Sequence, residues 1–292
     1  MARQKLSQAQ TRNLPAHETK HIATLEYKFR NSTFHLNQRN DGSTNGTALW
    51  MGGQVLSAWL AEHYSKKSRS KKCADPTARR PRVIELGSGI GLTALAMCSL
   101  GWDVFATDLP AVVDSVLLQN IATNMPNLPP GSGTIEVRVL DWNVPPMEWI
   151  WQDDRVIASE TRNPSESNSP TLEATTRLAP AFDLIISADT VYSPSLVAPL
   201  LRAVDHLSKQ TSGDEPARTQ QPSIFICLER RDPIVIERLL DEAKKTYTIE
   251  QVPERTMLQT MEKNGLTWNK NDWDGLEIWS FRQSEGKRQE IL

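Results

Sequence analysis

The chain has 292 residues, enough for one large domain or two small ones that bury a core without disulfides. Charged residues make up 23% of it and nearly cancel to a net charge of -2, so direct binding to nucleic acid is not expected. No apolar run approaches the roughly 20 residues that cross a bilayer, and we expect no membrane contact.

The three cysteines lack metal-ligand spacing, so no metal site is expected. Their usage predicts a reducing compartment, the cytoplasm first and the nucleus second. Residues 1–20 are polar and basic and have no apolar core of a secretory signal. A disordered tail over 1–20 is the simpler interpretation, and a mitochondrial address is the alternative.

The next part of the chain predicts a small hairpin and a helix. Residues 22–29 and 33–36 are predicted to be strands, followed by turn residues. Residues 54–64 predict a helix with one apolar face. The basic segment 66–82 is interpreted as a solvated insertion, with a patch for an acidic partner as the alternative.

From residue 82 onward, strands and helices alternate. Strands are predicted at 82–86, 103–107, 135–140, 182–188, 223–228, 247–252 and 276–281, and helices at 92–100, 111–124, 193–207 and 234–245. This alternation predicts an open α/β sheet with helices on both faces, in a single domain over 21–285. Polar or proline-rich insertions are predicted at 145–181 and 208–222, and a C-terminal tail at 286–292.

The most informative segment joins the first strand of this series to the next helix. Gly87, Gly89 and Gly91 tolerate positive φ and let the backbone approach a ligand, while the helix N-terminus offers free N–H groups. A dinucleotide loop has the spacing G-x-G-x-x-G, but Leu92 occupies the place of its third glycine. Glu85 adds negative charge where a pyrophosphate would be repelled. The spacing therefore favours S-adenosyl-L-methionine, with a tight turn that binds nothing as the alternative.

Carboxylates also end the next two strands. Asp108 closes the second strand, where it can accept hydrogen bonds from both ribose hydroxyls of a nucleoside or cap the following helix. Asp141 and Trp142 follow the third strand, where Asp141 is a polar contact and Trp142 packs beside an adenine or fills the core. Because dinucleotide enzymes use the same ribose contact, Asp108 alone does not discriminate between the cofactors.

The fourth strand ends in Asp189-Thr190-Val191-Tyr192, at the sheet edge where ligands bind. We expect Asp189 to face the reacting methyl group and Tyr192 to form an aromatic wall for a cationic substrate. A carboxylate aligns an amine but also favours its unreactive ammonium form, so Asp189 is assigned to positioning and the group that removes the proton is left open. The alternatives are an Asp that caps the next helix and a Tyr in the core.

These motifs resemble the seven-β-strand (class I) protein-lysine methyltransferases that act on non-histone proteins, of the methyltransferase-like 21 type. The resemblance covers roughly residues 50–281 apart from the long insertions, and the D-x-x-Y motif is its specific part. Its landmarks are Gly46-Thr47-Ala48-Leu49-Trp50, the loop from Glu85 to Gly91, Asp108, Gln119-Asn120, Asp141-Trp142 and Asp189-Thr190-Val191-Tyr192.

The resemblance implies a mostly parallel doubly wound sheet of seven strands in the order 3-2-1-4-5-7-6, with strand 7 antiparallel, after an N-terminal hairpin and helix. It implies a monomer with S-adenosyl-L-methionine as cofactor and a lysine-bearing protein as partner: an elongation factor, a chaperone or an AAA ATPase. The implied cofactor site comprises Trp50, Gly87, Ser88, Gly89, Asp108, Trp142 and Ala188, to which spacing adds Glu85, Gly91 and Asp141. The implied catalytic residues are Asp189 and Tyr192.

The three insertions and the segment 268–275 depart from compact family members, and we expect them to rim the site and shape substrate choice. Three other functions stay open from the sequence. The same scaffold suits methylation of a small molecule or a protein N-terminal amine, and it suits a silent module that binds the cofactor without turnover. An NAD-dependent oxidoreductase is the third, which Leu92 disfavours.

Overall fold

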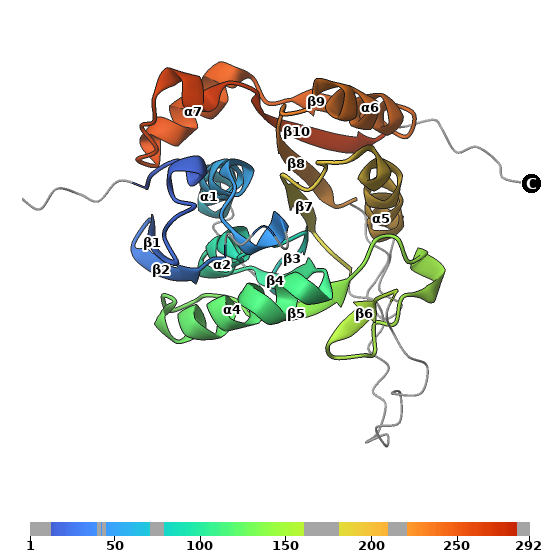
Figure 1. Cartoon of the computed structure of the whole chain (residues 1–292), viewed down its shortest axis with the longest axis horizontal. Coiled ribbons are helices and arrows are strands. Elements are labelled where there is room, and N and C mark those ends of the chain that lie inside the picture. The colour runs from blue at the N-terminus through green and yellow to red at the C-terminus, as the bar shows by residue number, and fades with distance from the viewer. Residues whose placement is uncertain are drawn as a thin grey trace, which may run out of the picture.

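A doubly wound sheet of eight strands organises the part of the chain that the computed structural model describes: residues 13–39, 42, 45–70, 79–160, 181–209 and 221–284, with backbone alone for 65–70 (Figure 1). The strands are β3 (Arg82–Leu86), β4 (Asp103–Asp108), β5 (Ile135–Leu140), β6 (Val156–Ala158), β7 (Leu184–Ala188), β8 (Ser223–Glu229), β9 (Tyr247–Gln251) and β10 (Leu276–Gln283). Their order is β6-β5-β4-β3-β7-β8-β10-β9. β10 runs antiparallel to β8 and β9, and the other neighbours in this sheet pair in parallel.

The predicted strand order is confirmed, with one strand more than the seven expected. β6 pairs in parallel with β5 and lies inside the segment predicted to be an insertion over 145–181. Trp149 and Trp151 of that segment are buried, and the ring of Trp151 lies 6.0 Å from that of Phe182. Burial of these indoles anchors the start of the insertion on the sheet. Its remainder, 161–180, lies outside the described residues.

The central strands β3 and β7 are covered on both faces. Val83 and Leu184 belong to one buried cluster, while Ile84 and Ile185 belong to another on the opposite face. Successive side chains of a strand point to opposite faces of the sheet, so a continuous apolar run fills two cores at once. This explains the unbroken apolar run 184–186 at the centre of the predicted strand 182–188.

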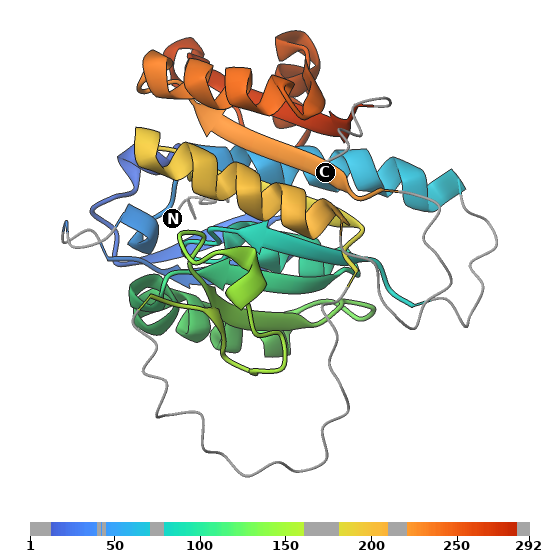
Figure 2. The same ribbon diagram turned by 90° about the vertical axis from the view of Figure 1, so that its right-hand side faces the viewer.

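Two helical layers complete these cores (Figures 1 and 2). One layer contains α1 (Met51–Ser70), α2 (Leu92–Ser99), α7 (Glu254–Lys263) and a helical segment made of α3 (Pro110–Val112), a π-helical turn (Val113–Leu117) and α4 (Leu118–Asn124). The other contains α5 (Val197–Lys209) and α6 (Pro233–Lys244). Among the described residues, no helix combines the length and the apolar character that crossing a bilayer requires.

Two helices differ from the sequence-based expectation: α1 is longer than predicted, and α7 (Glu254–Lys263) was not predicted at all. α1 continues to Ser70, past the predicted end at residue 64 and into the segment 66–82 that was predicted to be an insertion, of which 71–78 lie outside the described residues. Lysine and arginine are good helix formers, and a basic composition does not by itself end a helix. α7 was not predicted, because only Met257 and Met261 of its residues are buried and its apolar stripe is narrow.

The N-terminal hairpin of β1 (Thr24–Phe29) and β2 (Ser32–Asn37) is held by two amide side chains of α4. Asn120 accepts from the backbone N–H of Asn37 at 2.8 Å and donates to its carbonyl at 2.9 Å. Asn124 makes the same pair of bonds with His35, both of 2.8 Å. These side chains satisfy the outer edge of β2 as a neighbouring strand would.

Residues 13–20 pack against the body and differ from the tail predicted over 1–20. The side chain of Asn13 donates to the carbonyl of Lys28 at 2.7 Å, and the indole of Trp268 donates to the carbonyl of Asn13 at 2.9 Å. Ala16 is buried. The partner Trp268 comes from the opposite end of the chain, which composition near residue 20 does not reveal. The rest of the predicted tail, 1–12, lies outside the described residues, as do 285–292.

Candidate functional site

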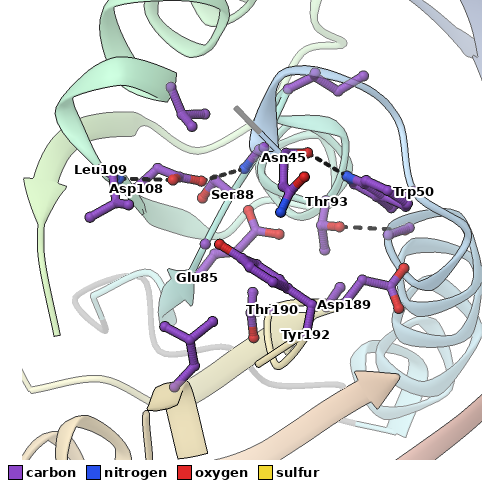
Figure 3. A pocket seen from close by; sticks show the side chains of 18 of the residues that line it. Asn45, Trp50, Glu85, Ser88, Thr93, Asp108, Leu109, Asp189, Thr190 and Tyr192 are labelled. Carbon is purple, nitrogen blue, oxygen red and sulfur yellow. Dashed lines mark hydrogen bonds between the residues drawn. The ribbon is translucent and has the colours of Figure 1, made fainter. Parts of the chain in front are cut away.

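A cavity of about 400 Å³ lies at the carboxyl ends of β3, β4, β5 and β7 (Figure 3). Parallel α/β sheets bind their ligands at this edge. Every residue predicted for the site lines the cavity except Gly91. The four strand ends therefore bring together residues that are widely spaced in the sequence.

The loop between β3 and α2 requires its glycines for two different reasons. Gly87 has φ of 78°, and a Cβ there would lie 2.4 Å from Cγ2 of Thr190, which follows β7. Gly91 has φ of 88°, and a Cβ there would lie 2.9 Å from Cδ1 of Leu117. Gly87 thus allows the loop to pass close beside the end of β7, whereas Gly91 serves helix packing and does not line the cavity.

Asp108 ends β4 with its carboxylate anchored by backbone amides. Its Oδ2 accepts from Gly89 and its Oδ1 from Leu109, both at 2.8 Å. Burial raises the pKa of Asp108 to about 6, and these two bonds oppose that rise. Each carboxylate oxygen can accept more than one hydrogen bond, so capacity remains for the two hydroxyls of a ribose. Asp108 therefore orders the glycine loop while facing the cavity.

Three buried polar atoms on this cavity have no hydrogen-bond partner in the described part of the chain: Oε2 of Glu85, Oγ of Ser88 and Nε1 of Trp142. Burial raises the pKa of Glu85 to about 8. Unpaired buried polar groups are costly, and they indicate a ligand that supplies the missing partners. S-adenosyl-L-methionine fits this set because its amino, carboxylate, ribose and adenine groups provide both donors and acceptors.

Asp189 adopts the left-handed conformation, with φ of 55°, directly after β7. Its Oδ2 accepts from the backbone N–H of Gly52 at 2.6 Å, and its own N–H donates to the carbonyl of Cys227 at 3.0 Å. Asp189 therefore caps the first turn of α1, and not the helix that follows it in the sequence. Burial raises its pKa to about 6, against the charge of Arg231 and the Gly52 bond, so the group is ionised at neutral pH.

Tyr192 stands at the mouth of the cavity, with 56% of its surface exposed, so it is not a core residue. Figure 3 shows its ring reaching across the cavity, while Asp189 points toward the start of α1. Trp142 is half-buried, and its carbonyl accepts from the guanidinium of Arg202 at 2.7 Å. Asp141 accepts from the N–H of Asn143 at 2.9 Å, which shapes the turn behind the indole.

Two cations beside Trp50 were missed by the sequence analysis. The indole of Trp50 donates to the carbonyl of Asn45 at 2.7 Å, which fixes its ring. Cζ of Arg231 lies 4.2 Å from the ring centroid, and Nζ of Lys20 lies 3.6 Å from it. The place of Arg231 just after a parallel strand is a signal that could have found it. Lys20 gave no signal, because it falls in the predicted tail.

An open sheet of this order, with a glycine loop after its first parallel strand and a carboxylate ending the second, defines a Rossmann-like methyltransferase fold. The chain belongs to the lysine methyltransferase family, whose sequence model matches residues 28–177. Membership gives S-adenosyl-L-methionine as the cofactor, in agreement with the unpaired polar atoms of the cavity.

Relatives agree with this assignment. The mouse (Mus musculus) protein-lysine methyltransferase METTL21E is 28% identical over 170 residues, which cover 57% of this chain and 53% of that protein. The fission yeast (Schizosaccharomyces pombe) protein-lysine N-methyltransferase rrg1 is 36% identical over 125 residues, 40% of this chain and 37% of that protein. The match thus spans about half the length of the curated relatives or less. Among solved structures, the human methyltransferase 10 domain containing protein is 10% identical, with a TM-score of 0.43 over 85% of this chain and 89% of that one.

Proposed function

We propose that this chain transfers methyl groups from S-adenosyl-L-methionine to the ε-amine of a lysine on a non-histone protein. The observation that carries the proposal is that the carboxylate of Asp189 shares one cavity with the glycine loop and with Asp108. A cofactor on the loop and an amine beside Asp189 would then meet in the same space. Family membership and relatives named as protein-lysine methyltransferases support the reaction.

The cofactor contacts follow the chemistry of the lining. Asp108 would accept from the ribose hydroxyls, and Glu85 would accept from the amino group of the methionine end. Gly87, Ser88 and Gly89 would surround this end with backbone and hydroxyl groups. The contacts assigned to the adenine and the rest of the nucleoside come from Trp50, Asp141, Trp142 and Ala188.

Asp189 and Tyr192 receive the acceptor amine. Methyl transfer is an in-line displacement at carbon, for which the sulfonium already provides a good leaving group, so the protein mainly orients the nucleophile. The carboxylate of Asp189 accepts a hydrogen bond from the amine, and the exposed ring of Tyr192 forms a wall against its alkyl chain and charge. These roles explain why an ionised Asp and an exposed aromatic ring line the same cavity.

The target class is proposed from the family resemblance: an elongation factor, a chaperone or an AAA ATPase. Tyr192 and Leu109 are exposed and line the cavity, so an entering lysine would meet apolar contacts at the mouth. We further propose that the enzyme acts as a cytoplasmic monomer.

A labelling experiment tests the proposal. The purified chain is incubated with S-adenosyl-L-methionine carrying a labelled methyl group and a heat-treated cell extract, in which other methyltransferases are inactive. A discrete labelled protein band, absent with heat-denatured enzyme and carrying methyl-lysine after hydrolysis, is the expected result. Label confined to small molecules or to an N-terminal amine would replace the proposal with the corresponding alternative. Cofactor binding by calorimetry without any transfer would identify a silent binding module.

A further inference from the structure

Arg231 links the end of β8 to the methyl-transfer cavity. Its backbone N–H donates to the carbonyl of Glu229 at 2.8 Å, which makes a tight turn directly after β8. Its guanidinium lies over the ring of Trp50, with Cζ 4.2 Å from the centroid, and pairs with the carboxylate of Glu229, while 43% of the side chain stays exposed. Arg231, Trp50 and Asp189 all line the cavity. A permanent positive charge therefore lines the cavity in which the acceptor amine is proposed to bind.

The charges around Asp189 come from two parts of the chain, the end of β8 and the N-terminal segment. Arg231 and Glu229 face it from the end of β8, and Lys20 faces it from the N-terminal segment. The effect of Arg231 on Asp189 exceeds the opposing effect of Glu229, so the carboxylate experiences net positive charge from that strand end. Burial raises the pKa of the neighbouring thiol of Cys227 well above its ordinary value, so that group stays uncharged.

The pKa of Lys20 shows how the surroundings of Trp50 affect an amine. Its Nζ lies 3.6 Å from the Trp50 centroid and donates to the carbonyl of Leu49. Burial is the largest cause that lowers the pKa of Lys20 from 10.5 to about 8; the charge of Arg231 lowers it as well, whereas Asp189 and Glu229 raise it. An amine held beside Trp50 thus loses its proton more readily than one in water.

We propose that Arg231 is a positioning residue of the methyl-transfer site: its guanidinium packs on Trp50, and its charge favours the ionised form of Asp189 and disfavours the ammonium form of the substrate lysine. This inference rests on the proposed function. It answers how the amine becomes reactive without a dedicated base, because the proton leaves to water as the amine enters. The neutral nitrogen then forms a bond to the methyl carbon while the carbon–sulfur bond breaks. Sulfur keeps that electron pair, and the products are an N-methylammonium and S-adenosylhomocysteine.

The test is the pH profile of methyl transfer in two variants. The probes are labelled S-adenosyl-L-methionine at saturation and the protein band labelled in heat-treated extract, with initial rates from about pH 6 to about pH 10. Removing a nearby positive charge raises the pKa of both Asp189 and the bound amine. In Arg231→Gln the rise of the rate with pH therefore moves to higher pH by about one unit. Arg231→Lys keeps the charge and returns the rise toward its original position.

Arg230→Gln is the matched control, because it removes the same charge one residue away. The Arg230 side chain pairs with Glu277 and Glu237, both at 2.6 Å, and does not line the cavity. We expect its profile to keep the wild-type position. Arg231→Gln would contradict the inference if it lowered the rate equally at every pH, left the profile unchanged, or shifted it no more than Arg230→Gln does.

The two levels of failure are distinguishable. A wild-type enzyme that labels a protein band but shares its pH profile with Arg231→Gln overturns the role of Arg231 alone. A wild-type enzyme that labels no protein overturns the proposed function, and the inference falls with it.

Discussion

The carboxylate of Asp189 and the backbone amide of Gly52 are joined by a hydrogen bond of 2.6 Å across 137 positions of the chain. The bond ties the end of β7 to the first turn of α1, just after the cavity residue Trp50. The carboxylate of Asp189 therefore has two roles. One oxygen caps the first turn of α1, and the group is also proposed to bind the substrate amine. Variants at this position have to separate the two.

Asp189→Asn and Asp189→Ala should differ in stability but not in activity. Asparagine keeps an oxygen that accepts the Gly52 N–H, whereas alanine removes the cap and costs about 0.5–2 kcal/mol of unfolding free energy. Both lose the charge that aligns the amine, and we expect transfer to fall by about 100-fold or more. Urea unfolding measures the stability, the extract assay measures methyl transfer, and calorimetry with S-adenosyl-L-methionine checks the cofactor affinity. Wild-type turnover in Asp189→Asn would reduce Asp189 to a helix cap.

Gly52→Ala and Gly53→Ala form a second matched pair. Alanine ordinarily stabilises a helix interior by about 1 kcal/mol relative to glycine. A Cβ on Gly52 would lie 2.6 Å from Oδ2 of Asp189, whereas a Cβ on Gly53 would meet nothing closer than Oγ1 of Thr93 at 3.8 Å. We therefore expect Gly52→Ala to destabilise the protein and Gly53→Ala to be neutral or stabilising in urea unfolding. Equal unfolding free energies of the two variants in urea would show that the Asp189 side chain moves away from the added Cβ at no cost.

Asp108→Ala should weaken binding of S-adenosyl-L-methionine by roughly 1.5–3 kcal/mol, because charged hydrogen bonds to the ribose are lost. Calorimetry measures this affinity directly. The variant also frees the amides of Gly89 and Leu109, so its thermal melt has to accompany the titration. Asp114→Ala is the control: this exposed carboxylate pairs with Arg155 at 2.7 Å and does not line the cavity. Unchanged affinity in Asp108→Ala would show that the ribose lies elsewhere.

Glu85 makes stability without cofactor depend on pH. Burial raises its pKa from 4.5 to about 8 in the folded state, so the folded protein holds this proton more tightly than the unfolded chain. The contribution of Glu85 to stability is therefore greatest below about pH 4.5 and declines as pH rises toward about 8. Glu85→Gln removes this titration. The unfolding free energy of the variant minus that of the wild type should therefore increase as the pH is raised from about 4.5 to about 8. Urea unfolding of both proteins across that window measures the difference, and a constant difference would contradict the raised pKa.

The sequence by itself determined the local elements that carry the site. The strand 182–188 can be recognised in the sequence because both of its faces are buried. The spacing of Gly87, Gly89 and Gly91 can be recognised because a loop that begins a helix is a local structure. Asp108 and Asp189 were marked by their positions at strand ends, since a parallel sheet brings such ends to one edge. The strand order came from the family resemblance.

Only the tertiary structure decided which partners these residues have. The helix that Asp189 caps, the cations beside Trp50 and the role of Gly91 in helix packing all depend on segments distant in the sequence. The docking of residues 13–20 likewise required Trp268 from near the other end. The physical reason is that periodicity and turn chemistry act over a few residues, whereas packing joins any two surfaces that fit, whatever their separation along the chain.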